Sequence, residues 1–107
     1  MRMALGMKNN MPQANVRINA KKEMNIACEC WFTSKGEMHP LMFKYQDEEG
    51  EIHTIKEIQV NSREEKDLIV SPYTEFDVTI NCQGIYMNTK LVFYKKECRW
   101  VMIIEHG

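Results

Sequence analysis

Four cysteines are the residues that most directly suggest chemistry. Cys28 and Cys30 lie two positions apart, and Cys82 and Cys98 follow much later in the chain. Thiolates are good zinc ligands, but structural zinc sites commonly use a Cys-x-x-Cys turn that brings two sulfurs to one ion. Cys28 and Cys30 instead belong to a segment of alternating apolar residues, where a free cysteine behaves as a small apolar side chain. We therefore predict core packing for them, and neither a metal site nor a cofactor.

A nucleophilic or redox role is a second hypothesis for the cysteines. Cys98 precedes Arg99 in a predicted turn, and a neighbouring positive charge favours the thiolate. An ordinary turn cysteine is the favoured alternative. The histidines His39, His53 and His106 have no serine or cysteine beside them in a recognised nucleophile motif. No catalytic residue is therefore predicted.

A short acidic run occupies residues 47–51. Its carboxylates are those of Asp47, Glu48, Glu49 and Glu51. Such a run can attract a divalent cation, but it lacks the Asp-x-Asp-x-Asp-Gly spacing of a calcium loop. A solvated hairpin turn is the better interpretation.

A basic and aromatic set near the carboxyl end has the ingredients of a partner or nucleic-acid surface. Its members are Tyr86, Lys90, Tyr94, Lys95, Lys96 and Arg99. Bases can stack on aromatic rings while cations follow the phosphates, at about 1–3 kcal/mol per stacked base. In that case Lys95, Lys96 and Arg99 should matter for binding and contribute little to folding. The favoured alternative places Trp100 and one tyrosine in the core, with lysines that keep a hairpin soluble.

Charge is unevenly distributed along the 107 residues, although the formal net charge is only −1. Residues 1–22 carry five basic residues and no acidic one, whereas residues 37–77 carry eleven acidic and four basic residues. Neither segment has the strongly basic composition of a dedicated nucleic-acid binder. No apolar stretch is long enough for a signal peptide or a membrane span. We expect a cytoplasmic protein with reduced cysteines and no membrane contact.

The elements that must position these groups are β-strands, because apolar residues recur at every second position. The clearest alternations cover residues 24–32, where Met24, Ile26, Cys28, Cys30 and Phe32 are expected on one face, and residues 76–82. Other strands are predicted near residues 14–21, 41–45, 52–60, 85–94 and 99–105. Residues 1–13 show no periodicity and read as a mobile tail, which leaves 14–107 as a single β domain.

Three local patterns qualify this assignment. The phase of the alternation changes between Ile55 and Ile58, which predicts a β-bulge near residues 56–57. Residues 62–65 match a Ser-x-x-Glu capping box, so one helical turn is expected there. Residues 99–105 are apolar on both faces, which is typical of a central or covered strand. The fold class is therefore all-β, a small antiparallel barrel or meander of about seven short strands with at most one helical turn.

One further pattern is a resemblance. It consists of Gly36-x-x-x-Pro40-Leu41-x-Phe43-x-Tyr45, then Asp47, Gly50, an Ile-rich strand and Arg99-Trp100. Residues 24–105 thereby resemble a family of small, uncharacterised all-β proteins of Gram-positive bacteria, some encoded beside lesion-bypass DNA polymerase genes. The chain differs by two extra residues in the turn at 47–50 and by a more acidic loop at 63–67. The resemblance implies no activity and no catalytic residue, and its gene neighbourhood implies a role near DNA repair.

The function predicted from the sequence is a non-enzymatic binding module that engages a protein or a nucleic acid. One alternative is a structural homodimer, in which an exposed apolar strand around Val101 and Ile103 is buried between two copies. Another is a cysteine-dependent redox or metal-binding protein.

Overall fold

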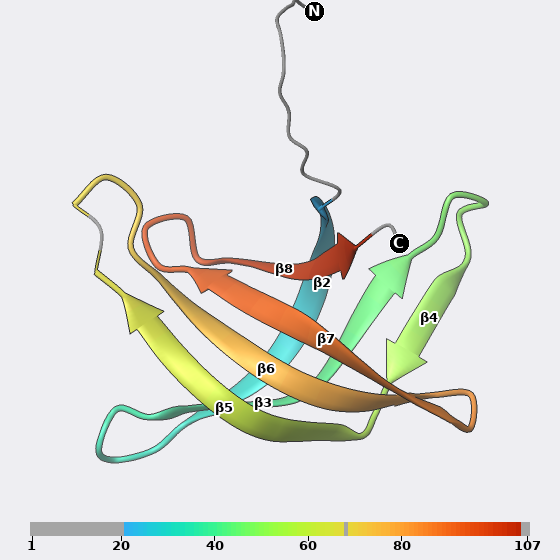
Figure 1. Cartoon of the computed structure of the whole chain (residues 1–107), viewed down its shortest axis with the longest axis horizontal. Coiled ribbons are helices and arrows are strands. Elements are labelled where there is room, and N and C mark those ends of the chain that lie inside the picture. The colour runs from blue at the N-terminus through green and yellow to red at the C-terminus, as the bar shows by residue number, and fades with distance from the viewer. Residues whose placement is uncertain (1–20, 68, 106–107) are drawn as a thin grey trace, which may run out of the picture.

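The computed structural model describes residues 21–67 and 69–105, and they form one antiparallel sheet of seven strands (Figure 1). The strands are β2 (Lys21–Phe32), β3 (Met38–Gln46), β4 (Ile52–Ile55), β5 (Ile58–Lys66), β6 (Tyr73–Cys82), β7 (Ile85–Tyr94) and β8 (Arg99–Glu105). Their order in the sheet is β4-β3-β2-β8-β7-β6-β5. The described residues contain no helix, so the predicted all-β class is confirmed. The predicted tail at 1–13 and most of the predicted strand at 14–21 lie outside the described residues.

The sheet curls into a half-barrel whose concave face holds the core (Figure 1). Phe76 and Leu91 lie opposite each other on β6 and β7, and both are fully buried. Phe43 of β3 is also fully buried, and the Trp100 ring of β8 lies 5.7 Å from that of Phe76. Alternation in these strands therefore places one apolar row of each strand against the others, as the sequence predicts.

The strands β4 and β5 are consecutive in the chain but lie at opposite edges of the sheet. Residues 56 and 57 carry the chain between these edges, and the N–H of Asn81 on β6 donates to the carbonyl of Glu57 at 3.4 Å. The curl brings the edges together, because β3 contacts β5 and β4 contacts β6. The predicted β-bulge at 56–57 is therefore wrong: the change of phase marks a break between two strands.

The predicted helical turn at 62–65 is also wrong. These residues belong to β5, where Glu64 pairs with Glu75 and Ser62 pairs with Asp77 of β6. The register shifts between Val60 and Ser62, so the irregularity of this strand lies there. A capping box is a local signal, and pairing with a long neighbouring strand satisfies the same backbone groups.

The strand β8 occupies the centre of the sheet, between β2 and β7, as its two apolar faces predict. On the convex face Val101 lies opposite Val92 of β7 and is fully buried. The expectation of an exposed strand around Val101 is therefore wrong. The expectation that Phe32 shares the inward face of its strand is also wrong, because its side chain is 66% exposed. The register of β2 shifts between Glu29 and Cys30, ahead of this residue.

Candidate functional site

The predicted basic and aromatic set is spread along β7 rather than gathered in one cluster. Tyr86, Lys90 and Tyr94 share the convex face of β7, because they are four residues apart on one strand. Tyr86 lies eight residues from Tyr94, which is about 27 Å along an extended strand. Tyr94 and Arg99 do meet: the guanidinium carbon of Arg99 lies 4.8 Å from the centre of the Tyr94 ring.

Most cations of this set already contact carboxylates. Lys90 pairs with Glu75 at 3.1 Å and Lys95 with Glu65 at 2.8 Å. The nearest carboxylate to Arg99 is that of Glu97, at 2.6 Å. The ammonium of Lys96 donates to a backbone carbonyl, that of Ile69, at 3.2 Å. A phosphate would have to displace these carboxylates, which weakens the electrostatic case for a nucleic-acid surface.

Tyr94 and Arg99 also join three strands of the convex face. The Tyr94 hydroxyl donates to the carboxylate of Glu23 on β2, and Arg99 donates to the Asn25 side-chain oxygen at 3.1 Å. Burial and the neighbouring Glu23 raise the pKa of Tyr94 to about 12. These contacts give Tyr94 and Arg99 partners on β2 within the sheet.

Three of the four cysteines pack against the core, including Cys28 and Cys30, for which core packing was predicted. Cys28, Cys30 and Cys82 pack against the buried cluster on the concave face, and all four cysteines are free. Burial, followed by the neighbouring Cys30, raises the pKa of Cys28 to about 12. Burial also raises the pKa of Cys30. Cys98 is exposed in the turn before β8, with a φ of 50°.

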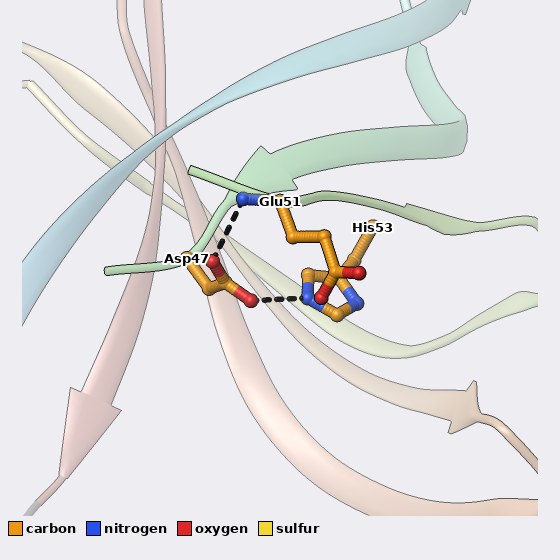
Figure 2. Close-up of side chains that lie close together, drawn as sticks. All are labelled: Asp47, Glu51 and His53. Carbon is orange, nitrogen blue, oxygen red and sulfur yellow. Dashed lines mark hydrogen bonds and ion pairs between the residues drawn. The ribbon is translucent and has the colours of Figure 1, made fainter. Parts of the chain in front are cut away.

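Asp47 organises the acidic hairpin between β3 and β4 (Figure 2). One oxygen of its carboxylate accepts the backbone N–H groups of Glu49 and Glu51, both at 2.9 Å, and the other lies 2.7 Å from His53 Nε2. The hydrogen bond from His53 is the main cause that lowers the pKa of Asp47. The His53 ring in turn stacks on Tyr45, with ring centres 4.9 Å apart.

This cluster is the part of the acidic run that sequence reasoning missed. Among the described residues, Asp47, Glu51 and His53 form the only group of three with ligand atoms within 4.8 Å of one another. Both oxygens of Asp47 are engaged by donors of the hairpin itself, so the arrangement stabilises the turn. His53 could have been found from the hairpin register, which pairs it with Tyr45 and turns it toward the start of the turn.

A cavity of about 580 Å³ opens where β7 and β8 separate. Pairing between these strands ends at Lys90 and Ile103. Beyond that point Ile85–Thr89 stays paired with β6, whereas the end of β8 stays paired with the start of β2. The Thr89 hydroxyl donates to the Ile103 carbonyl at 3.0 Å and closes the narrow end. The cavity is therefore a wedge between β7 and β8, whose ribbons diverge in Figure 1.

The lining of the wedge is mostly apolar, with a few polar groups. Methionines contribute much of it: Met24, Met87 and Met102 come from three different strands. Tyr45 and Asn88 are among the polar residues of the lining. Such a lining is typical of ligand pockets, which combine an apolar wall with a small number of polar groups.

The edge of β7 that faces the wedge carries backbone groups without a strand partner in the described chain. The two-residue turn at Gln83 and Gly84 makes Cys82 and Ile85 the first bonded pair of the hairpin. Bonded and non-bonded pairs alternate from there, so the N–H and C=O groups of Tyr86 and Asn88 point away from β6 and toward the wedge. Tyr86 is also 68% exposed.

Comparison with models of protein families found no match for the chain, and comparisons with curated proteins and with solved structures found none. The family resemblance and its implied link to DNA repair therefore stay predictions. Within residues 21–67 and 69–105, no helix is long and apolar enough to cross a membrane.

Proposed function

We propose that the chain is a non-enzymatic binding module that takes up an extended segment of a protein partner in the wedge between β7 and β8. The observation that carries this proposal is the edge of β7 at Ile85–Thr89, which has no strand partner among the described residues, beside a mostly apolar cavity of about 580 Å³. Added strands gain main-chain hydrogen bonds from such an edge, while pockets for alternate side chains supply specificity.

The wedge offers both parts of that interaction. The backbone groups of Tyr86 and Asn88 can bond a peptide main chain, and every second side chain of the peptide would enter the cavity. Met24, Met87 and Met102 line it, and flexible methionines adapt to ligands of different shape. The exposed hairpin residues Ile85 and Tyr86 extend the contact area beyond the cavity.

A protein partner is favoured over a nucleic acid on electrostatic grounds. The cations Lys90, Lys95 and Arg99 each lie within 3.1 Å of a carboxylate. The mostly apolar lining of the wedge, by contrast, suits the apolar side chains of a peptide better than phosphates. A cytoplasmic location belongs to the same proposal and is supported by four cysteines that are free thiols.

A selection from a random peptide library displayed on phage tests the proposal, followed by fluorescence anisotropy of the enriched peptides with the purified protein. The informative variant is Tyr86→Pro, because proline removes the N–H that faces the wedge while the ladder to β6 does not use that group. Tyr86→Ala is its matched control, since it removes the same ring and keeps the N–H. We expect Tyr86→Pro to weaken binding at least tenfold relative to Tyr86→Ala.

Other outcomes would overturn the proposal. Equal affinities of the two Tyr86 variants would exclude strand addition at β7. Salt-sensitive binding of labelled oligonucleotides that is lost on replacing Lys95, Lys96 and Arg99 with Ala would instead establish a nucleic-acid surface. A stable dimer in light scattering that dissociates with Tyr86→Pro would identify the edge as the interface of a homodimer.

A further inference from the structure

We infer that a second cavity, at the end of the half-barrel away from the wedge, binds a small carboxylate that carries an apolar group. This cavity has a volume of about 210 Å³, and none of its lining residues lines the wedge. Residues near the starts of β2 and β7 line the wedge, whereas residues near the ends of these strands line the second cavity. The inference therefore goes beyond the proposed function. It rests on a buried hydroxyl and a guanidinium that have no partner among the described residues, and on two aromatic rings beside them.

The second cavity lies where β5 and β7 end and β6 begins (Figure 1). The register of the sheet places Thr74 of β6 between Glu65 of β5 and Phe93 of β7. Residues that lie opposite each other in an antiparallel pair share one face of the sheet, and Phe76, two residues after Thr74, packs in the core on the concave face. Thr74, Glu65 and Phe93 therefore share the concave face. Phe32, the last residue of β2, lines the same cavity.

The hydroxyl of Thr74 is a polar group that the fold does not use. Thr74 is only 2% exposed, and its hydroxyl makes no hydrogen bond with any residue in the ranges 21–67 and 69–105. Most buried polar side chains have a partner, because burial of an unpaired hydroxyl costs stability. Thr74 also lines the second cavity, so a ligand there can provide the missing partner. A hydroxyl can donate to a carboxylate oxygen.

The charges of the lining favour a ligand with one negative charge. Two cations, Arg63 and Lys95, and one carboxylate, that of Glu65, line the second cavity. Lys95 pairs with Glu65 at 2.8 Å and also lies 3.8 Å from Asp67, which is not part of the lining. The guanidinium of Arg63 makes no ion pair or hydrogen bond within the described chain. Its planar group of donors fits the two oxygens of a carboxylate.

Two aromatic rings provide the apolar part of the site. The ring of Phe93 packs against that of Trp100, with ring centres 5.1 Å apart, so the core supports it from behind. Phe32 is 66% exposed, and a ligand in the second cavity would cover part of that surface because both phenylalanines line it. The volume of about 210 Å³ is smaller than the roughly 300–1,000 Å³ of pockets for drug-sized molecules. The ligand class is therefore a small carboxylate with one ring or a short alkyl chain.

The test titrates the full chain with three related probes and follows the backbone amides by nuclear magnetic resonance. Phenylpropanoate has a carboxylate and a ring, phenylpropanamide has nearly the same shape without the charge, and acetate has the charge without the ring. We expect phenylpropanoate to bind with a dissociation constant of about 1 mM or tighter and to shift the amides of Thr74 and Phe93 most. The other two probes should bind about tenfold more weakly or not at all.

Two variants remove the polar groups of the site, and a third is the matched control. Arg63→Gln should weaken the binding of phenylpropanoate about tenfold, whereas Lys44→Gln, which removes the same charge from an exposed position on β3, should change it less than about twofold. Thr74→Val keeps the shape of the side chain and removes its hydroxyl. It should weaken binding about threefold or more and leave the melting temperature unchanged or higher, because the hydroxyl has no partner in the described chain.

Several outcomes would overturn the inference. Equal binding of phenylpropanoate and phenylpropanamide, or no binding of either, would exclude a carboxylate site. Equal affinities of the wild type and Arg63→Gln would exclude the guanidinium as the group that recognises the charge. Amide shifts confined to residues of the wedge, such as Met87 and Met102, would place the ligand in the other cavity. A lower melting temperature for Thr74→Val would show that its hydroxyl stabilises the free protein and is not reserved for a ligand.

Discussion

The Tyr94 hydroxyl on β7 donates a hydrogen bond to the carboxylate of Glu23 on β2, across the intervening strand β8. The two residues are far apart in the chain, and their contact connects β7 with β2, the first described strand. Tyr94 was predicted as a binding residue, but its hydroxyl is committed to this structural contact. The convex face is thus held together by polar side chains above the buried pair Val92 and Val101.

Replacing this hydroxyl should therefore destabilise the fold. We expect Tyr94→Phe to lower the free energy of unfolding by roughly 1 kcal/mol, below the usual value for a charged acceptor because Glu23 is partly exposed. Urea unfolding followed by tryptophan fluorescence measures the change. Tyr86→Phe is the matched control, since the Tyr86 ring is exposed at the far end of the same strand. A loss of similar size in both variants would contradict the assignment.

Acid should weaken the hairpin that Asp47 organises. The hydrogen bonds to Asp47 lower its pKa in the folded chain, so the carboxylate stabilises the fold at pH values above the ordinary aspartate pKa of about 4. That contribution is lost as the pH falls through the lowered pKa. Asp47→Asn should remove it, so the stability difference between wild type and variant should shrink as the pH falls from about 5 to about 2.5.

The control for this measurement comes from the same turn. Glu48 is exposed and makes no hydrogen bond or ion pair within the described chain. Glu48→Gln should leave the pH dependence of unfolding as in the wild type. If Glu48→Gln and Asp47→Asn flatten the pH dependence equally, the hydrogen bonds of Asp47 are not its cause.

A substitution in the turn between β6 and β7 should stabilise the fold. Gln83 has a φ of 56° and Gly84 a φ of 89°, which is the geometry of a type I′ turn. Asparagine adopts the left-handed region at lower cost than glutamine. Gln83→Asn should raise the free energy of unfolding by about 0.5–1 kcal/mol, and Gly84→Ala should lower it. Thermal melts of both variants check this; a lower melting temperature for Gln83→Asn would exclude a type I′ turn.

The cysteines should differ strongly in reactivity. At pH 8 a thiol whose pKa is about 12, such as Cys28, is almost wholly protonated, and the thiolate is the reactive form. Native protein titrated with a thiol reagent should therefore show one fast group, the exposed Cys98, and slow labelling of Cys28. The fast phase should vanish in Cys98→Ser. Rapid labelling of Cys28 in the native state would contradict its burial.

Strands that bury one face could be predicted from the sequence, because the core selects apolar residues at every second position. The alternation from Phe76 to Cys82 became the inner row of β6. The errors arose where the position of a segment in the sheet determines its conformation. A break between two edge strands and a β-bulge produce the same change of phase in the sequence. At residues 62–65 the capping-box pattern is present, but the residues pair with β6 instead of forming a helical turn.

The candidate site depends on where strand pairing ends and on long-range contacts, which local patterns do not encode. The wedge exists because β8 leaves β7 after Ile103 and stays paired with β2. The neutralising pair of Lys95 and Glu65 joins residues thirty positions apart. Composition identified the lysine, but nothing near it in the sequence indicated that a carboxylate would already be there.

The strand order has a consequence for how the chain folds and opens. Strands β2 to β4 form one series of adjacent hairpins and β5 to β8 another, and the ladder between β2 and β8 joins the two series within the sheet. That ladder links residues that are distant in sequence, such as Ile26 and Trp100, so its loop-closure entropy is the largest in the sheet. We expect the two hairpin series to form first and the β2–β8 seam to zip last. The same seam should be the first to fray on the folded protein, and its fluctuations would set the rate at which any segment enters or leaves the adjoining wedge.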